Sequence, residues 1–399
     1  MSGITSTLIG SVRFLSMTTI YFDNNATTRM TDEVVATLTS AASSGYANPA
    51  SQHEMGRIAR QKLESCREQI GQLLHLPTGG RCIFTSGGTE ANNLALMGHF
   101  PSPGKLEESN VVCSSIEHPS IIDTLAALKK SGLEIRWVDP DASGSVDPKM
   151  FDSAIDSNTR LACCMLANHE TGVIQPVSEI ASVCRRRKVP FHVDAVQAIG
   201  KIPFDFAAVG CSSATFSAHK IHGPPGIAAL FVSEGIQLTP RQFGGFQQEG
   251  IRPGTESLPL IAAFAKSVEL AVLELAAHRQ HLLNLRDHFE EVLCSRLENT
   301  VINAQDSDRL PGTSNISFLG MDRQQFVMAA DLSGLCCSTG SACSSGSSTE
   351  SHVLKAMNCG KPVLHSAVRF GFSRLNRLSE IDLAIERICR IFSTFRESK

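Results

Sequence analysis

The stretch ATFSAHKIHGPPGIAALFV, residues Ala214–Val232, places a lysine between two apolar runs. Lys220 lies between His219 and His222, shortly before Gly-Pro-Pro-Gly at residues 223–226. Each apolar run has the length and composition of a buried strand. A lysine normally keeps its ammonium group in water. The prolines restrict the backbone just beyond it, because their rings lock φ at about −65°. Lys220 is therefore either a surface lysine at a strand edge or an amine held in place for chemistry.

Short apolar runs alternate with amphipathic helical patterns from about residue 60 to residue 260. Examples are RCIFTS followed by EANNLALMGHF, and NVVCSS followed by HPSIIDTLAALKKSG. Such alternation predicts right-handed strand–helix–strand crossovers around a mostly parallel sheet flanked by helices, which is an α/β fold. From residue 258 to residue 297 the pattern is helical almost throughout, and a mixture of strand and helix patterns follows it.

We expect two domains, because single cores stop growing at roughly 250–300 residues and the chain has 399. The large domain is predicted over residues 31–262. A smaller α+β domain is predicted from residues 17–30 together with residues 263–399, and it carries a Ser/Gly-rich loop at about 335–350. The acid-free residues 1–16 weakly resemble a transit peptide, and Met17 is an equally good natural start. The sequence leaves open whether this segment is a disordered extension, a targeting segment or upstream of the true start.

Composition excludes several functional classes. The net charge is −3 and no basic face is evident, so we expect no nucleic-acid partner. No apolar run approaches the roughly 18 residues of a membrane span, and we expect a soluble protein. The thirteen cysteines are odd in number and include no C-x-x-C pair. We therefore predict no structural metal site and place the protein in a reducing compartment, the cytoplasm.

Two further stretches bear on the role of Lys220. TSGGTEANNLAL ends a strand, turns on two glycines and begins a helix near Thr89, where free backbone N–H groups can cradle a phosphate. A plain turn capped by Thr89 is at least as good an explanation of that stretch alone. PFHVDAVQAIG ends a strand at Asp194, with Gln197 three residues later. A carboxylate at this edge of a parallel sheet lies where α/β proteins bind ligands, although it can equally cap the helix that follows.

Together these parts are what pyridoxal 5'-phosphate requires. The amine of Lys220 forms a Schiff base with the cofactor, Asp194 pairs with its pyridinium nitrogen, and a helix N-terminus holds its phosphate. With that nitrogen protonated, the ring withdraws electrons and weakens bonds at the substrate's Cα. Ser217 and His219, which precede the lysine on the same turn, would flank the phosphate.

The chain is similar to the cysteine desulfurases of the NifS/IscS type, within the class-V aminotransferase family and the fold type I pyridoxal-phosphate enzymes. The resemblance runs from about Ile20 to Leu383 and rests on the ordered pieces YFDNNATT, TSGGTEANN, EHPSI, NHETGVIQP, HVDAVQAIGK, SAHKIHGPPG, RPGTES, STGSACSSG and VRFGFS. It implies a homodimer that converts L-cysteine to L-alanine and an enzyme-bound persulfide. The resemblance also implies that an acceptor protein takes the sulfur for iron–sulfur cluster assembly or tRNA thiolation.

The resemblance assigns roles at the matching positions. Lys220 carries the cofactor, His118 stacks on its ring and shuttles protons, and Gln197 hydrogen-bonds its phenolic oxygen. Arg369 clamps the substrate carboxylate by a bidentate pair, a geometry suited to arginine, and Asn168 contacts the same carboxylate. The implied cofactor contacts are Lys220, Asp194, Gln197, His118, Gly88, Thr89, Ser217, His219, Asn168 and, from the partner subunit, Thr255.

The sulfur-transfer step needs a nucleophile that can travel, and Cys343 lies in the Ser/Gly-rich stretch STGSACSSGSS. Such a stretch has little to pack and low local stability. The resemblance implies that Cys343 takes the sulfur atom from the substrate as a persulfide. On the residues alone, an inert cysteine in a linker is the alternative. The predicted catalytic residues are therefore Cys343, Lys220 and His118.

Two departures from the family pattern bear on substrate preference and on the partner surface. Phe246 stands where relatives commonly have a glycine, and GFSRLN follows Arg369 in place of the usual ending. A selenocysteine lyase or another class-V lyase is the first alternative function, and turnover of cysteine against selenocysteine separates it from a desulfurase. A sulfur-assembly scaffold without catalysis is the second alternative. Such a scaffold would have lost Lys220 or Asp194, and this chain retains both.

Overall fold

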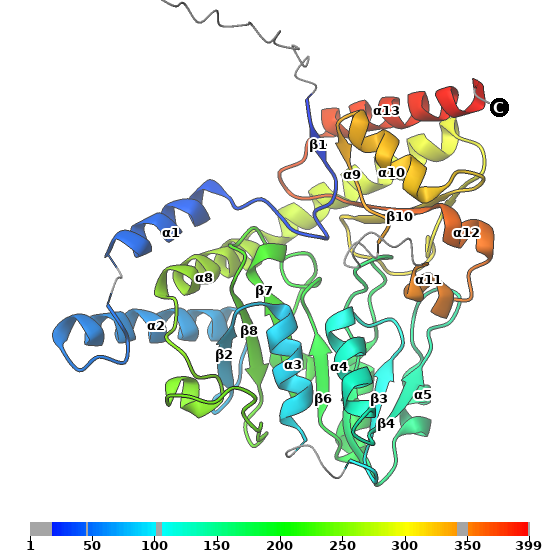
Figure 1. Cartoon of the computed structure of the whole chain (residues 1–399). Coiled ribbons are helices and arrows are strands. Elements are labelled where there is room, and N and C mark those ends of the chain that lie inside the picture. Colours follow the sequence, from blue (N-terminus) through cyan, green and yellow to red (C-terminus); the bar gives the residue numbers. More distant parts are fainter. Residues whose placement is uncertain (1–17, 45–46, 101–105, 341–349, 398–399) are drawn as a thin grey trace, which may run out of the picture.

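The structure is a computed structural model that describes residues 18–44, 47–100, 106–340 and 350–397 (Figure 1). Its larger part surrounds a seven-stranded sheet, drawn in blue, cyan and green. Its smaller part, drawn mainly in yellow to red, lies above that sheet together with the N-terminal strand β1. The segment predicted over residues 1–16 lies outside the described residues, as does most of the predicted Ser/Gly-rich loop.

The central sheet has the strand order β2-β8-β7-β6-β5-β3-β4. Its strands are β2 (Arg81–Thr85), β3 (Asn110–Ser114), β4 (Glu134–Val138), β5 (Thr159–Cys163), β6 (Phe191–Asp194), β7 (Ser213–Ser217) and β8 (Ala228–Val232). Neighbours from β7 to β4 pair in parallel, whereas β8 runs antiparallel to both β7 and β2. The turn that carries Lys220 joins β7 to β8 and is too short for a parallel crossover, which needs about a dozen residues. The predicted α/β class with a mostly parallel sheet is confirmed.

Helices cover both faces of the sheet, because successive strand side chains point to opposite faces. Ile83 packs in the apolar cluster under α3 and α4, whereas its neighbours Cys82 and Phe84 pack in the cluster on the other face. The helices of the larger part are α1 (Asp32–Ser44), α2 (Glu54–Leu73), α3 (Gly88–Gly98), α4 (Pro119–Lys129), α5 (Pro148–Ala154), α6 (Val177–Arg187), α7 (Phe206–Val209) and α8 (Leu258–Leu273).

The smaller part has a separate apolar cluster built on a three-stranded antiparallel sheet, β12-β10-β9, and on the parallel pair β1-β11. Its elements are β1 (Ile20–Tyr21), α9 (Leu275–Arg296), β9 (Thr300–Ile302), β10 (Thr313–Phe318), α10 (Arg323–Leu332), β11 (Leu335–Cys336), α11 (His352–Ala356), α12 (Lys361–Ser366), β12 (Ala367–Gly371) and α13 (Leu378–Glu397). Phe22 packs with Phe289 and Phe370 in this cluster. Helix α8 packs with the larger cluster as far as Ala271, and the predicted domain boundary at 262/263 stays a prediction.

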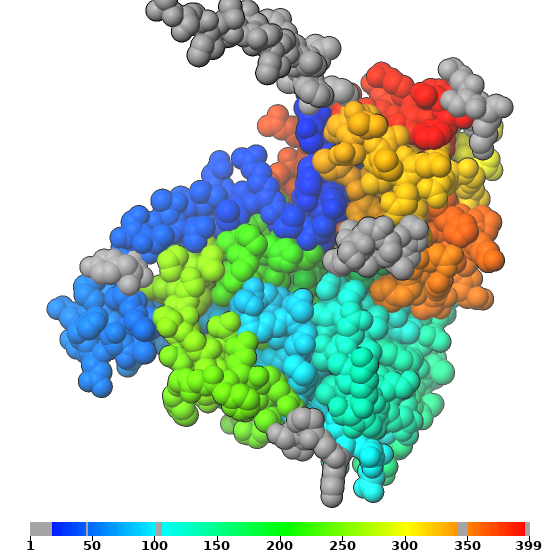
Figure 2. Space-filling model, in the orientation of Figure 1, coloured from blue at the N-terminus to red at the C-terminus, as the bar shows by residue number. Residues whose placement is uncertain are grey.

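Helices α1 and α2 extend from one side of the molecule, where they are drawn in blue (Figure 2). They carry apolar side chains that are exposed in the single chain, namely Val35, Met55 and Ile58. In the part of the chain that the structure describes, no helix has both the length and the apolar character needed to cross a bilayer.

Candidate active site

A cavity of about 610 Å³ lies at the carboxyl ends of β5, β6 and β7, between the larger and the smaller part. The carboxyl ends of parallel strands are where α/β folds bind their ligands. The predicted site residues that line this cavity are Gly88, Thr89, His118, Asp194, Gln197, Ser217, His219, Lys220 and Arg369. Arg369 comes from β12 of the smaller part, so both parts contribute to one cavity.

Lys220 ends a single 3-10 turn that directly follows β7. Its Nζ lies 2.6 Å from the carbonyl oxygen of Asn25 and 2.7 Å from that of Ala26, in the segment after β1. The turn beyond it is packed tightly, because a Cβ on Gly223 would lie only 2.9 Å from the carbonyl oxygen of Ala218. The glycine and the two prolines therefore hold the amine at a defined place in the cavity wall.

Asp194 is the last residue of β6 and is buried. Its Oδ1 accepts a hydrogen bond from the backbone N–H of Val196 at 2.9 Å, and its Oδ2 accepts one from Asn92 Nδ2 at 2.8 Å. Asn92 Oδ1 in turn lies 3.1 Å from His192 Nε2, which fixes the orientation of the amide. The carboxylate thus caps the turn after β6 and also lines the cavity, and its role in ligand binding stays a prediction.

The N-terminus of α3 and the end of β7 form one polar wall of the cavity. Ser217 Oγ is buried there without a hydrogen-bond partner among the described residues. A Cβ on Gly88 would lie 3.2 Å from Val196 Cγ2 and 3.8 Å from Ser217 Cβ, so the glycine keeps this corner open. Burial lowers the pKa of His219, whose Nδ1 lies 3.2 Å from Thr27 Oγ1, to about 4. An anionic group would satisfy the serine hydroxyl and the free N–H groups of the helix.

Two imidazoles of the cavity wall stack edge to face. His118 caps α4, and its Nδ1 accepts from the backbone N–H of Ser120 at 3.1 Å. Burial lowers the pKa of His118, although the Asp194 carboxylate opposes this effect. The ring of His169 lies 5.5 Å from that of His118, and burial lowers the pKa of His169 well below its ordinary value. Both rings are therefore neutral near pH 7.

Arg369 is 3% exposed, and its guanidinium is held by the surrounding chain. Nη2 lies 2.8 Å from Asp23 Oδ1, and Nη1 donates to the carbonyl oxygen of His169 at 3.0 Å. The Nε–H is buried without a partner among the described residues. A planar guanidinium fixed on one edge and with an unused N–H on another is suited to bind a carboxylate.

Two predicted residues do not line this cavity, and a third is not among the residues that the structure describes. Asn168 is buried, and its Oδ1 accepts from the backbone N–H groups of Glu170 and Thr171, both at 2.9 Å. That side chain stabilises a turn, and its contact with cofactor and substrate stays a prediction. Thr255 is exposed and does not line the cavity of its own chain. Cys343 lies outside the described residues.

Several residues that shape the cavity were not singled out from the sequence. Asn25, Asn92, His169 and His352 all line it. The sequence held a signal for each of the first three, since they lie within the pieces YFDNNATT, TSGGTEANN and NHETGVIQP. No periodicity distinguishes them from neighbouring polar residues, because their role depends on contacts made across the fold.

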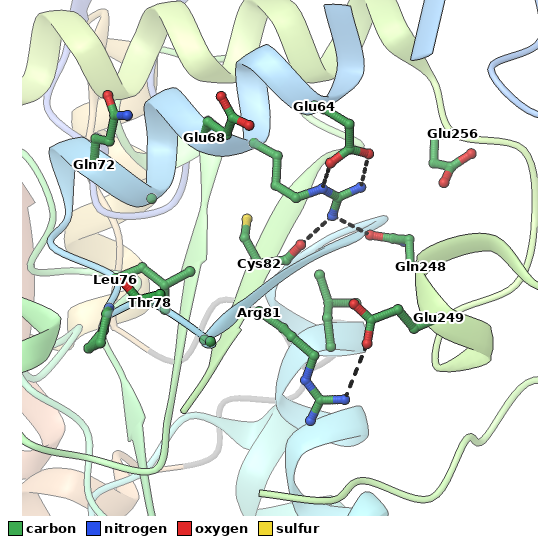
Figure 3. Close-up of a pocket in the computed structure, with 16 residues that line it drawn as sticks. Glu64, Glu68, Gln72, Leu76, Thr78, Arg81, Cys82, Gln248, Glu249 and Glu256 are labelled. Atoms are coloured by element: carbon green, nitrogen blue, oxygen red, sulfur yellow. Dashed lines mark hydrogen bonds and ion pairs between the residues drawn. The ribbon is translucent and has the colours of Figure 1, made fainter. Parts of the chain in front are cut away.

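A second pocket, of about 440 Å³, lies between α2, the turn before β2 and residues 247–250 (Figure 3). Arg67 pairs with Glu64 at 3.0 Å, and Arg81 lies 3.8 Å from Glu249. Both arginines that line this pocket are thus paired with glutamates, and none of the predicted site residues lines it. We therefore assign the active site to the larger cavity.

Comparison with known proteins gives the family. The sequence model of the class-V aminotransferases matches residues 20–383. The chain is 36% identical to cysteine desulfurase 2 of Trichormus variabilis over 380 residues, which are 95% of this chain and 94% of the relative. Its structure is similar to that of a NifS-like protein, with a TM-score of 0.87 and 31% identity over 94% of this chain and all of that one. It is also similar to SspA in complex with cysteine, with a TM-score of 0.78 and 29% identity over 90% and 100% of the two chains.

The chain therefore belongs to the class-V aminotransferase family of enzymes. Within that family it groups with the cysteine desulfurases.

Proposed function

We propose that the protein is a pyridoxal-phosphate-dependent cysteine desulfurase, which converts L-cysteine to L-alanine and leaves a persulfide on Cys343. One observation carries the proposal: a single cavity gathers the Lys220 amine, the Asp194 carboxylate and the Ser217 hydroxyl, which has no partner in the described part of the chain, beside the N-terminus of α3. These groups fit the aldehyde, the ring nitrogen and the phosphate of the cofactor. When bound, the cofactor supplies an electron sink that weakens bonds at the substrate's Cα.

The residues of the cavity divide the work of binding and proton transfer. Lys220 would hold the cofactor covalently, and Asp194 would keep the ring nitrogen protonated. Arg369 would bind the substrate carboxylate through its Nε–H, which no described residue accepts from. His118, kept neutral by burial, would accept and return a proton above the ring face.

Sulfur transfer balances without an outside oxidant. The thiolate of Cys343 forms an S–S bond to the sulfur of the substrate while the Cβ–S bond of the substrate breaks. The electron pair of the broken bond stays with Cβ, which takes up a proton and becomes the methyl group of alanine. The enzyme keeps the persulfide Cys–S–SH. SspA, a similar structure, is solved with cysteine bound, which supports L-cysteine as the substrate here.

The proposed homodimer would complete the cavity with Thr255 from the partner subunit. The segment before Thr255 presents two phenylalanines to solvent in the single chain, Phe243 at 92% exposure and Phe246 at 84%. An ion pair at 2.8 Å between Arg252 and Glu90 fixes the same segment to α3. Large exposed aromatic side chains mark protein–protein contacts, and a second copy of the chain is the partner that would bury them.

The dimer has its own test. The double change Phe243→Ser and Phe246→Ser should lower the molar mass measured by light scattering at micromolar concentration, and it should weaken retention of the cofactor phosphate. Leu332→Ser, on α10, removes a side chain that is 82% exposed and serves as the control. A dimer that persists unchanged in the double variant would place the interface elsewhere.

The acceptor of the sulfur is proposed to be a protein of iron–sulfur cluster assembly or a relay protein of tRNA thiolation. A cytoplasmic location is proposed with it. The cysteines in the described part of the chain are free thiols, as expected in a reducing compartment, and this supports the proposed location.

The experiment that tests the cofactor assignment is Lys220→Ala. We expect the wild-type protein, supplied with pyridoxal phosphate, to gain visible absorbance that survives gel filtration and becomes fixed to the chain by borohydride. The variant should lose the covalent fixation. Lys266→Ala removes a lysine that pairs with Glu269 at 2.6 Å on α8 and should behave as wild type. Borohydride fixation that persists in Lys220→Ala would refute the role of this lysine.

A further inference from the structure

A second lysine lies behind the cavity wall. Lys201 follows the turn after β6, and its Nζ lies 2.6 Å from Gln197 Oε1. Lys201 does not line the cavity itself; it borders a small space of about 30 Å³ that it shares with Lys220. The reaction outlined above gives this lysine no role. Placing the charged Lys201 close to the charged Lys220 costs free energy, so the presence of Lys201 calls for a physical reason.

The contact with Lys201 decides which way the Gln197 amide points. A charged ammonium group only donates hydrogen bonds, so the amide must turn its carbonyl oxygen toward Lys201. The NH₂ group then points the other way, and Gln197 Nε2 donates to the carbonyl oxygen of Asn25 at 3.0 Å. The same carbonyl oxygen accepts from Lys220 Nζ at 2.6 Å. One chain of hydrogen bonds thus links the two lysines through Gln197 and Asn25.

We infer that Lys201 is a positioning residue that fixes Gln197 as a hydrogen-bond donor toward the cavity. The inference rests on the proposed function and on the role that the family resemblance implies for Gln197, a hydrogen bond to the anionic phenolic oxygen of the cofactor. Without Lys201 only the Asn25 carbonyl oxygen orients the amide, so a flip that turns the Gln197 carbonyl oxygen toward the phenolic oxygen, which it would repel, costs less. Lys201 acts only through Gln197 and touches neither substrate nor cofactor.

The electrostatic surroundings agree with a residue tuned for such a task. Burial, together with the nearby charges of Lys220 and Arg369, lowers the pKa of Lys201 to about 7. A lysine perturbed in this way beside a ligand cavity is more often part of a site than of the general surface.

The test is a pH titration of the visible absorbance of the holoenzyme. The N–H that Gln197 donates would stabilise the anionic phenolic oxygen of the cofactor. Losing this hydrogen bond should therefore raise the pKa of the nitrogen that would join Lys220 to the cofactor. We expect Lys201→Met and Lys201→Gln to raise the midpoint of the absorbance change by about one pH unit. Lys201→Arg keeps a permanent donor and should restore most of the wild-type midpoint. Lys266→Met removes a lysine with an equally short hydrogen bond on α8 and should leave the midpoint unchanged.

A double-mutant cycle separates positioning from the charge of Lys201 alone. If Lys201 acts through Gln197, then Lys201→Met should shift the midpoint much less in a Gln197→Ala background than in the wild type. Equal shifts in both backgrounds, or no shift in either, would overturn the inference while leaving the proposed function standing. A wild-type protein that gains no visible absorbance with pyridoxal phosphate would overturn the proposed function, and the inference with it.

Discussion

Asn92 Nδ2 lies 2.8 Å from Asp194 Oδ2, so a buried amide holds one oxygen of the carboxylate while the backbone N–H of Val196 holds the other. The amide is itself oriented by His192, whose Nδ1 lies 2.8 Å from Ser213 Oγ. This chain of contacts runs across three neighbouring elements, α3, β6 and β7. Asp194 therefore presents a carboxylate whose direction is set before any ligand arrives, which is the preorganisation that electrostatic catalysis requires.

The first prediction follows from that carboxylate. Asp194→Asn keeps the size of the side chain but removes the negative charge that would hold the ring nitrogen of the cofactor protonated. We expect kcat to fall by about 100-fold or more, the scale seen when one preorganised electrostatic group is lost. Steady-state alanine formation measures the effect, and Asp152→Asn, at a surface ion pair with Arg187, is the matched control. Activity within about twofold of the wild type would contradict the assigned role.

The second prediction concerns Arg369. Arg369→Lys keeps the charge but loses the planar fork that binds a carboxylate in two places. The structural bonds to Asp23 and to the carbonyl oxygen of His169 would be weakened as well. We expect KM for L-cysteine to rise by about 10-fold to 100-fold, with a smaller change in kcat. Arg374→Lys, on the same C-terminal segment, pairs with Glu274 and should leave KM unchanged. A change confined to kcat would show that Arg369 does not bind the ground-state carboxylate.

The third prediction concerns the pH dependence of stability. Burial raises the pKa of Glu117 from its model-compound value of 4.5 to about 8, although a hydrogen bond from Ser114 opposes the rise. Between those two pH values the folded protein keeps a proton that the unfolded chain releases. The stability contributed by the protonated carboxyl is therefore full below about pH 4.5 and is lost as pH rises toward 8, by up to about 1.4 kcal/mol per pH unit.

Glu117→Gln removes this titration but keeps an oxygen that can accept from the backbone N–H of Met165, as Oε1 does at 2.6 Å. The wild type should lose stability from about pH 5 to about pH 8, whereas the variant should not. We therefore expect the free energy of unfolding of the variant, minus that of the wild type, to become more positive over this range. Urea unfolding of the cofactor-free protein measures it, and a constant offset between the two proteins does not affect the slope. Parallel pH curves for wild type and variant would mean that Glu117 is ionised in the folded protein.

Much of the fold could be predicted because local patterns agree with the final architecture. The apolar runs around Lys220 became β7 and β8, and the polar residue at the end of PFHVD lies at the end of β6, beside the cavity. The reversed direction of β8 was not predicted, since a mostly parallel sheet was expected throughout. The connection between the two apolar runs, residues 218–227 with Gly-Pro-Pro-Gly near its end, already held that information, because a parallel crossover needs about a dozen residues or more.

The candidate site could be predicted only in part. Residues at strand ends or in conspicuous turns, such as Asp194 and Lys220, lie in the cavity as expected. Asn92 and Asn25 were not predicted, because they gain their roles through partners about 100 or more residues away along the chain, to which local patterns are blind. The helix after TSGG begins at Gly88 with Gly87 as its N-cap, so Thr89 does not cap it.

The central claim is that the protein moves sulfur from L-cysteine to Cys343. The most direct measurement is the formation of alanine from L-cysteine by the holoenzyme, with and without a thiol reductant, for the wild type and for Cys343→Ala. The wild type should form alanine faster when the reductant removes the enzyme persulfide, while the variant binds cofactor normally and forms almost no alanine. Cys294→Ala, which removes an exposed cysteine on α9, should behave as wild type. Alanine and sulfide released by Cys343→Ala at the wild-type rate, or turnover of selenocysteine alone, would contradict the account.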